Sequence, residues 1–538
     1  MGIKASTSQG HKRDIRWPLP GALALLLLTL GLSVLRLAPP APRPSGAPSG
    51  DFSAARARAL LTDLASGDTP RPAGSAPAAR TRERAAAELR RLGYAVREEE
   101  ANACNELGSC RSVRNLVAEL PGREPGSAVA LVSHYDSVAA GPGIADDLSG
   151  VAATLEVARA LKAGPPLRHA VLFLIDDGEE EGLLGARAFV MQSLDAARVK
   201  AVVNLEARGT SGPSLMFETG RDNAEAVALF ARAVPHPRAS SLFPLAYDLL
   251  PSLTDFSIFK HRGVTGFNFA FIGDPARYHS PLDTLANLSS ASLQHQGENA
   301  LATVRALADT DLDRPRRGSS VFFDVLGLRV FAWPVAWGPL LAAVPLMLSV
   351  VTAVKLHRRS LVTVAGVARG LLAWWAVPVL AAVAGLALSF ALRLAGLRAL
   401  WPPHGVLVQA AFWLLASAVT LLVTHGLRRQ EFLGLWTGGS LVWALLGLMT
   451  ALLLPGASYL FMVPAWMAGT AGLFLPGGER TRAAVAILPA LAAAVLWFPL
   501  LILFYDGLGS PVLWLLGTLL ALVLTPIVPL AARQPYRA

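Results

Sequence analysis

The sequence predicts an α/β layered domain between one N-terminal membrane helix and a C-terminal bundle of membrane helices. Three observations support this fold class. Of the 538 residues 53% are hydrophobic and only 16% are charged, whereas about a quarter are charged in typical soluble domains. From residue 330 onward long apolar runs dominate, with three acids and twelve Lys or Arg. Before that point, short apolar runs alternate with helical patterns, as in α/β layers.

The charge distribution points to membrane topology. The chain carries a net charge of +10, and nearly all of it lies in short connections between the apolar runs after residue 330. A basic patch for nucleic acid would instead gather on one face of a soluble domain. We therefore expect a lipid bilayer as a partner and no nucleic acid.

The first apolar run predicts a retained signal-anchor helix at residues 18–38, after a cytoplasmic segment at 1–17. Its length of about 20 residues suits a membrane span. Lys4, Lys12, Arg13 and Arg16 precede it, which keeps the N-terminus in the cytoplasm. A cleaved signal peptide is the alternative, but the Pro-rich sequence that follows suits a cleavage site poorly.

Seven further apolar runs predict a transmembrane domain at residues 330–532, followed by a cytoplasmic tail at 533–538. The runs cover 330–354, 368–391, 405–424, 433–454, 457–475, 483–504 and 511–531. Connections expected in the cytoplasm carry nine Lys or Arg and those expected outside carry two, so residues 39–329 should lie outside the cytoplasm. The least certain turn is Pro455-Gly456: if the two runs beside it formed one interrupted segment, the later helices would invert.

The membrane runs give no positive sign of transport. None of the predicted helix interiors contains Asp or Glu, whereas proton relays and ion sites within membranes usually need an ionisable group. The sequence assigns no chemistry to the seven-helix block.

The soluble part begins with a Pro-rich linker at 39–51 and continues as an α/β domain over 52–315. Periodicity and turn signals predict helices at 52–65, 78–92, 148–161 and 183–193, and strands at 114–119, 129–133, 170–175 and 201–205. In folds of this class, ligands gather at the carboxyl ends of the strands.

Histidines and carboxylates follow these strand ends. His134 and Asp136 follow one strand, and Asp146 lies after a Gly-Pro-Gly turn before a helix. An acidic run that includes Glu179 and Glu180 follows the next strand, and the remaining candidates are Asp147, Asp176, Asp177, Glu181, Glu206 and His279. A lone histidine is more often structural, and an acidic run is more often a solvated loop. Their repetition at successive strand ends favours a shared site.

Histidine nitrogen combined with carboxylate oxygen suits zinc, with manganese or cobalt as alternatives. Five candidate ligands exceed the three that a single catalytic zinc usually takes, which implies two ions and a bridging carboxylate. The spacing of His134 and Asp136 lets the aspartate hold the unused ring nitrogen. In the pair Glu179-Glu180, one carboxylate can bind metal while its neighbour stays free as a general base.

The motifs SHYDSVAAGPGIADDLSGVAA, DDGEEEGLLGARAF, NLEARG and YHSPLDT, in that order, resemble the co-catalytic dinuclear-zinc aminopeptidase family. That family includes bacterial aminopeptidases, glutamate carboxypeptidase II and glutaminyl cyclases. The resemblance covers about residues 52–310 and implies a three-layer α/β zinc-peptidase domain with a mixed sheet between helices. An anchor, an external peptidase domain and a C-terminal helix block together resemble the subgroup of endoplasmic reticulum metallopeptidase and vacuolar membrane protease.

The resemblance implies a role for each matching residue. The implied metal ligands are His134, Asp146 as the bridging carboxylate, Glu180, Glu206 and His279. The implied catalytic residues are Glu179 as general base, Tyr278 as the group that steadies the oxyanion and Asp136 as the residue that orients His134. In the family, the residue after the bridging aspartate, here Asp147, is joined by a cis peptide. Secreted members usually have Asp where this chain has Glu206, and Asp176 and Asp177 depart from the pattern without a reason visible in the sequence.

Two alternatives bear on this assignment. Because three glutamates occur in a row, a shifted register would make Glu180 the base and Glu181 the ligand. A related two-metal family inserts a lid domain between its ligands, but the interval from Glu206 to His279 leaves little room for one.

Cys104 and Cys110 are the two cysteines of the chain. A disulfide between them would close a small loop, and an extracytoplasmic location permits it. Two free thiols are the alternative.

The sequence thus predicts a membrane-anchored zinc metallopeptidase with two Zn²⁺ per subunit, acting on peptides outside the cytoplasm and most consistent with an aminopeptidase. That side would be the periplasm in a bacterium, or the lumen of the endoplasmic reticulum or vacuole in a eukaryote. One alternative is a transport or scaffold protein with a peptide-binding domain. Another is glutaminyl cyclisation or carboxypeptidase action on the same fold.

Overall fold

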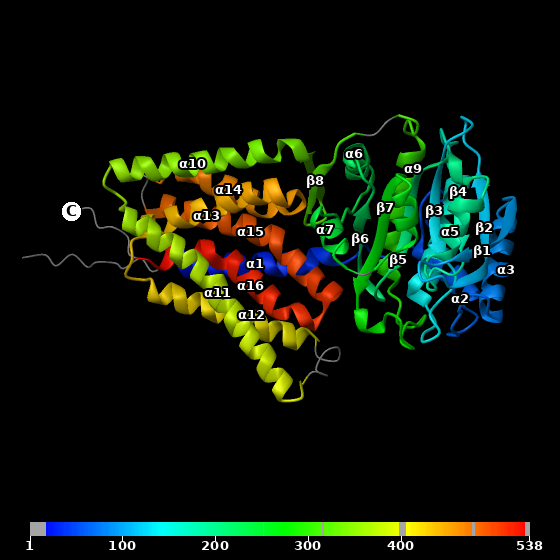
Figure 1. Ribbon diagram of the computed structural model, residues 1–538, viewed down its shortest axis with the longest axis horizontal. Coiled ribbons are helices and arrows are strands. Elements are labelled where there is room, and N and C mark those ends of the chain that lie inside the picture. Colours follow the sequence, from blue (N-terminus) through cyan, green and yellow to red (C-terminus); the bar gives the residue numbers. More distant parts are fainter. Residues whose placement is uncertain (1–17, 251, 315–316, 398–404, 476–478, 533–538) are drawn as a thin grey trace, which may run out of the picture.

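The computed structural model describes residues 18–532 except 251, 315–316, 398–404 and 476–478. Two parts lie end to end along the long axis (Figure 1). One part contains the β-sheet with its covering helices, and the other contains long helices together with the N-terminal helix α1 (Pro18–Leu37). The predicted fold class, an α/β domain with a helical C-terminal part and an N-terminal apolar helix, is confirmed.

Among the described residues, seven strands form one mixed sheet in the order β1-β2-β4-β3-β5-β7-β6. Its strands are β1 (Val96–Cys104), β2 (Cys110–Leu120), β3 (Ala128–His134), β4 (Ala170–Asp176), β5 (Val199–Ala207), β6 (Ser211–Thr219) and β7 (Thr265–Gly273). The central strands β4, β3, β5 and β7 run parallel, and the others pair antiparallel at the two sides. The carboxyl ends of the four parallel strands therefore meet at one edge of the sheet.

Helices cover both faces of this sheet, which confirms the expected three layers. Contacts among the helices and apolar side chains place one set on one face and a smaller set on the other. The first set comprises α2 (Ala54–Ala65), α3 (Ala76–Arg91), α4 (Ser149–Lys162), α6 (Ala224–Ala233) and α9 (Ser290–Ala308). The second comprises α5 (Leu184–Gln192) and α8 (Asp255–His261), while α7 (Leu242–Tyr247) packs beside β6.

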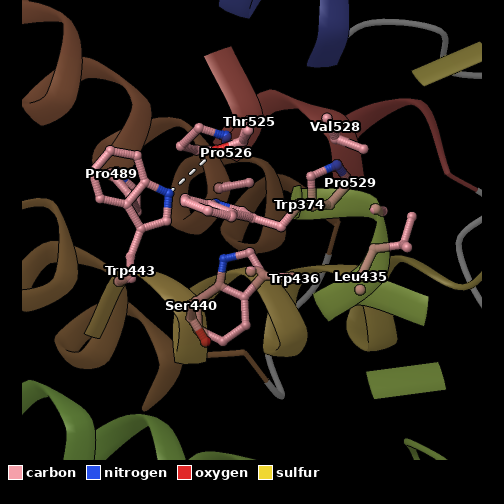
Figure 2. A pocket seen from close by; sticks show the side chains of 15 residues that line it. Trp374, Leu435, Trp436, Ser440, Trp443, Pro489, Thr525, Pro526, Val528 and Pro529 are labelled. Atoms are coloured by element: carbon pink, nitrogen blue, oxygen red, sulfur yellow. Dashed lines mark hydrogen bonds between the residues drawn. The ribbon is translucent and has the colours of Figure 1, made fainter. Parts of the chain in front are cut away.

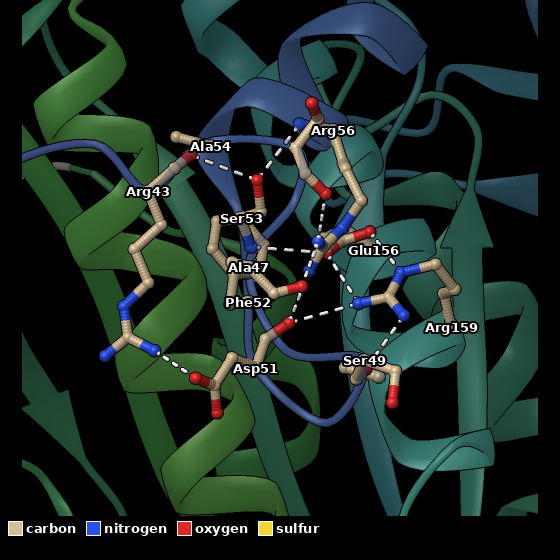
Figure 3. A network of polar contacts seen from close by, with 12 residues as sticks. Arg43, Ala47, Ser49, Asp51, Phe52, Ser53, Ala54, Arg56, Glu156 and Arg159 are labelled. Carbon is tan, nitrogen blue, oxygen red and sulfur yellow. Dashed lines mark hydrogen bonds and ion pairs between the residues drawn. The ribbon is translucent and has the colours of Figure 1, made fainter.

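The expected linker at 39–51 lies against the domain through a network of polar contacts (Figure 3). Glu156 of α4 is completely buried and forms ion pairs with Arg56 at 2.8 Å and Arg159 at 2.7 Å. These arginines also donate to backbone carbonyls of the segment, including those of Ala47 and Ser49, at 2.9 and 2.8 Å. The segment is thus irregular in backbone but fixed in place.

The helical part differs from expectation at its start. The first run was expected to be helical from residue 330, but β8 (Ser320–Val325) and β9 (Arg329–Pro334) form a two-stranded hairpin there. Helix α10 (Gly338–Arg358) follows it. Residues 329–334 pair with residues 320–325 and therefore cannot be part of the helix.

The other helices of this part are α11 (Val364–Leu394), α12 (Gly405–Gly426), α13 (Phe432–Leu453), α14 (Tyr459–Gly472), α15 (Glu479–Leu508) and α16 (Leu513–Leu524). Within the described ranges, seven helical segments are long and apolar enough to cross a membrane. The run at 457–475, expected as an eighth, forms α14. Its 14 residues extend about 21 Å, less than the ~30 Å of a hydrocarbon core. Asp506 lies in the last turn of α15, which extends beyond the run expected at 483–504.

Helices α11 and α13 pack closely because both carry glycines four residues apart. A Cβ added at Gly370 would lie 2.6 Å from the carbonyl oxygen of Gly434, and one at Gly438 would lie 2.5 Å from the amide nitrogen of Leu371. Small residues at this spacing let membrane helices approach backbone to backbone.

Tryptophans fill the space beside this contact (Figure 2). Trp374 of α11 and Trp436 and Trp443 of α13 surround a cavity of about 30 Å³. Trp443 donates a hydrogen bond to the hydroxyl of Thr525 at 3.3 Å. A cavity of this size has room for about two water molecules, so the helices are well packed here.

Candidate metal centre

The parallel strands bring the predicted site residues to one edge of the sheet. His134 ends β3, Glu206 lies at the end of β5, and Tyr278 and His279 follow β7. Glu179 and Glu180 lie in the turn after β4, and Asp146 lies in the turn between β3 and α4. Residues separated by up to 145 positions thus converge because their strands share a direction.

One group of ligand atoms comprises His134, Asp146 and Glu206. The Nε2 atom of His134 lies 3.5 Å from Oδ1 of Asp146 and 3.8 Å from Oε2 of Glu206. All three side chains are buried. The Nε2 atom has no hydrogen-bond partner in the described part of the chain, although it points at two carboxylates.

A second group comprises Asp146, Glu180 and His279. The Nε2 atom of His279 lies 3.1 Å from Oδ2 of Asp146 and 3.1 Å from Oε2 of Glu180. Asp146 therefore belongs to both groups, with one carboxylate oxygen facing each histidine. The peptide bond between Asp146 and Asp147 is cis, as the family resemblance implied.

Asp136 supports both sides of this arrangement. Its carboxylate lies 3.4 Å from Nδ1 of His134. The same carboxylate accepts hydrogen bonds from the backbone N–H groups of Glu179, at 3.1 Å, and of Glu180, at 3.2 Å. Nδ1 of His134 also lies 3.2 Å from the backbone carbonyl oxygen of Asp136, so this residue fixes both the histidine ring and the turn that carries the glutamates.

The three consecutive glutamates point in different directions. Glu180 faces His279, as described, and Glu179 lines a cavity beside Asp146 and Glu206. Glu181 instead forms an ion pair with Arg111 at 2.5 Å. The geometry therefore distinguishes Glu181 from the two residues that face the site.

Burial and clustered charge shift the pKa values of these groups in different directions. Burial, followed by the charge of Glu206, raises the pKa of Glu179 well above its usual value. Burial also raises the pKa of Glu206, to about 7. The two histidines outweigh burial at Asp146 and lower the pKa of that carboxyl.

Tyr278 lines the same cavity as Glu179. Its ring stacks on the ring of His279, with centroids 3.7 Å apart and an angle of 18° between the planes. The guanidinium of Arg208 lies 5.9 Å from the centre of the Tyr278 ring. The structure thus brings Tyr278 to the site together with every predicted ligand.

Several residues around the centre were missed in the sequence. Asp283 accepts hydrogen bonds from the backbone N–H groups of Ala145, at 2.7 Å, and of Asp146, at 3.3 Å, and so holds the turn that presents Asp146. The buried Arg71 donates to the carbonyl of Gly143 in the same turn at 2.8 Å. Asp283 lies within the quoted motif YHSPLDT, which was an available signal, whereas nothing in the sequence distinguished Arg71.

The structure also gives places to the two aspartates that departed from the family pattern. Asp177 accepts a hydrogen bond from the backbone N–H of Arg114 at 3.2 Å, which ties β2 to the turn after β4. Asp176 lies against Asp255 of α8. Burial, followed by the charge of Asp255, raises the pKa of Asp176 well above its usual value.

Cys104 and Cys110 form a disulfide, with their Cα atoms 4.0 Å apart. The bond joins opposite positions of β1 and β2 at the end of their hairpin. Next to it, Asn105 donates a hydrogen bond to the backbone carbonyl of Glu181 at 2.9 Å. The hairpin end therefore contacts the turn of the glutamates.

Residues 115–304 match the model of peptidase family M28, so the chain contains a domain of that family. It is 38% identical over 239 residues to endoplasmic reticulum metallopeptidase 1 of Mus musculus, covering 43% of this chain and 27% of the mouse protein. It is 33% identical over 211 residues to a vacuolar membrane protease of Candida albicans, covering 39% of this chain and 24% of that protein. The matches thus span about a quarter of the length of these relatives.

Among solved structures, a Zn-dependent exopeptidase from Parabacteroides distasonis is similar. It has 19% identity and a TM-score of 0.39, and the match covers 48% of this chain and 99% of that one.

Proposed function

Because the chain carries a peptidase family M28 domain, we propose that it is an integral-membrane zinc metallopeptidase. In this proposal it binds two Zn²⁺ ions and removes N-terminal residues from peptides outside the cytoplasm. The observation that carries the proposal is the position of Asp146, whose two carboxylate oxygens face different histidines in two ligand groups.

The donor set fits zinc. Histidine nitrogens and carboxylate oxygens are ligands that zinc takes in proteins. The buried Nε2 of His134, which has no hydrogen-bond partner among the described residues, is suited to bind an ion. In the proposal His134, Asp146 and Glu206 hold one ion, Asp146, Glu180 and His279 hold the other, and Asp136 orients His134.

Bound zinc supplies Lewis acidity, which polarises the scissile carbonyl and lowers the pKa of a water molecule at the centre. Glu179, which lines the cavity beside Asp146 and Glu206, then accepts the proton of the attacking water. The same side chain donates that proton to the leaving amine. Tyr278 offers a hydroxyl that can steady the developing oxyanion.

The test uses the full chain in lipid nanodiscs. Hydrolysis is measured with matched peptides whose N-termini are free or acetylated, before and after removal of metal with a chelator and after zinc is added back. We expect zinc-dependent release of the N-terminal residue from the free peptides alone. Cleavage of both peptides would indicate an endopeptidase, and cyclisation of an N-terminal glutamine without hydrolysis would indicate a cyclase.

A further inference from the structure

The candidate metal centre opens into a cavity with walls of two kinds. Asp146, Glu179, Glu206 and Tyr278 form the wall on the side of the metal ligands. Apolar side chains form much of the rest, including Phe243 of α7 and Leu215 and Phe217 of β6. The cavity measures about 140 Å³. For comparison, an apolar cavity of roughly 150 Å³ accommodates a benzene molecule.

A membrane helix closes this cavity. A further part of the wall consists of Leu503, Phe504, Gly507 and Leu508, which lie in the last two turns of α15. Their spacing places Phe504, Gly507 and Leu508 on one face of the helix. In Figure 1 the end of α15 reaches the sheet domain beside β6 and β7. Residues of both strands line the cavity.

Direct contacts join this face of α15 to the sheet domain. The ring of Phe504 lies edge-on to that of Phe243, with centroids 6.1 Å apart. A Cβ added at Gly507 would lie 3.6 Å from Cδ1 of Ile272 on β7, an ordinary van der Waals distance. The glycine therefore leaves space that a larger side chain would occupy on the cavity side.

Neighbouring contacts hold the helical part in register with the cavity. The hydroxyls of Ser240 and Tyr459 are hydrogen-bonded at 2.7 Å, and Ser241 donates to the carbonyl of Gly456 at 2.8 Å. The rings of Tyr459 and Phe323 stack with centroids 4.4 Å apart. These contacts fix the start of α14, which packs along α15, relative to the sheet domain.

We propose that the end of α15 is a specificity wall: Phe504 and Gly507 set which side chain of the substrate fits beside the metal centre. The size and apolar lining of the cavity select a side chain such as leucine or phenylalanine. The inference rests on the proposed function for the identity of the substrate. It gives the helix block a role in substrate choice in addition to anchoring.

The test compares two opposite changes in the full chain. Gly507→Leu fills the cavity, and Phe504→Ala enlarges it. Binding of phenylalaninol and alaninol, which have the amine and the side chain but no scissile bond, is measured by calorimetry in nanodiscs. In parallel, kcat/KM is measured for peptides with N-terminal phenylalanine, leucine or alanine. Loss or gain of a methylene-sized volume in an apolar pocket typically changes discrimination by roughly 10-fold or more.

We expect Gly507→Leu to lower the preference for phenylalaninol over alaninol at least about 10-fold. Phe504→Ala should lower kcat/KM for the peptide with N-terminal leucine relative to the peptide with N-terminal phenylalanine. The matched controls are Leu488→Ala on the exposed face of α15 and Gly426→Leu, where a Cβ would meet nothing within 4 Å. Both controls should keep the wild-type preference, and all four variants should bind the same amount of zinc.

The two measurements separate this inference from the proposed function. Unchanged preferences in both cavity variants, with zinc fully bound, would overturn the role of α15 even if peptides are hydrolysed. Conversely, altered alcohol preferences in a chain that hydrolyses no peptide would support the wall and refute the peptidase activity.

Discussion

Glu179, Glu180 and Glu181 are adjacent and chemically identical, yet their surroundings differ. Glu180 faces a histidine, Glu179 lines the cavity, and Glu181 pairs with Arg111. In the proposed mechanism, a carboxylate held by metal cannot readily take up a proton, whereas its free neighbour can. The difference between them is one of position alone, so isosteric amide variants test it.

We expect Glu179→Gln to reduce turnover by roughly 10²–10⁴-fold, the usual contribution of a general base, while both zinc ions stay bound. Glu180→Gln should lose part of the zinc, and added zinc should restore some activity. Glu181→Gln is the matched control and should change both quantities little. Metal analysis and kcat together show which glutamate is the base and which is the ligand. If the Glu181 variant loses metal while the Glu180 variant keeps metal but is inactive, the assignment is wrong by one residue.

Asp146 gives a second prediction at this scale. Asp146→Asn should lower the affinity for both zinc ions, because the two ligand groups share that carboxylate. His134→Ala should lower mainly the affinity for the ion that His134 would hold together with Glu206. Inductively coupled plasma mass spectrometry on purified full-length protein measures the difference. Two ions retained per chain in the Asp146 variant would contradict a bridging role.

The candidate site was predictable from the sequence to the extent that its residues lie in motifs. His134 and Glu206 lie at the ends of apolar strands of an evident pattern, and Asp146 lies in the turn after the first of these strands, so their convergence followed from strand direction. Arg71 reaches the turn that presents Asp146, and Asp255 reaches Asp176, from segments with no such pattern. Their contribution depends on tertiary packing, which no local signal records.

Among elements, the most regular strands were the most predictable. The strand expected at 129–133 is β3 (Ala128–His134), because a buried parallel strand is a continuous apolar run. By contrast, β7 lies between β5 and β6 but was not predicted. Gly266, Asn268 and Gly273 interrupt its apolar residues, and these types are depleted in strands. Contacts with both neighbouring strands outweigh that weak propensity.

The glycine contact between α11 and α13 supports a prediction at the scale of elements. Gly438→Ile places branched carbons against the backbone of α11, where even a Cβ would be 2.5 Å from an amide nitrogen. We expect the free energy of unfolding to fall by about 1–3 kcal/mol or more, as it does in other overpacked interiors. Gly31→Ile in α1 is the control, since a Cβ there meets nothing within 4 Å. Thermal unfolding in detergent compares them, and equal unfolding temperatures would contradict the packing account.

At the scale of the whole molecule, both parts meet at one end of the helix block. Helix α10 begins next to the β8–β9 hairpin and runs away from the sheet domain (Figure 1). The turn at Pro455-Gly456 contacts the sheet domain through Ser241. The basic residues Lys355, Arg358 and Arg359 lie at the other end of α10. This polarity is the one expected if the basic connections are cytoplasmic and the sheet domain lies outside the cytoplasm, as the sequence predicts.

The topology prediction follows from that polarity. With α13 and α14 joined as a hairpin, both termini should be cytoplasmic. This prediction requires that α14 cross the membrane, although its 14 residues extend only about 21 Å. A reporter fused after Ala538 should therefore be active only in the cytoplasm. A second reporter inserted at the Pro455-Gly456 turn should behave in the opposite way. The prediction fails if the C-terminal reporter is active only on the outer side.

The segment at 39–51 controls how far the sheet domain can move from helix α1. A flexible linker of 13 residues would have an end-to-end distance of roughly 20 Å in variable directions, whereas the contacts around Glu156 hold this segment against the domain. In the proposed topology, the height of the catalytic centre above the lipid surface is then constant. A peptide that is itself tethered to the bilayer can present its free end only if enough extended residues, at about 3.3 Å each, bridge that height. The ion pairs of Glu156 with Arg56 and Arg159 would thus set a minimum number of residues between the membrane anchor and the free end of such a substrate.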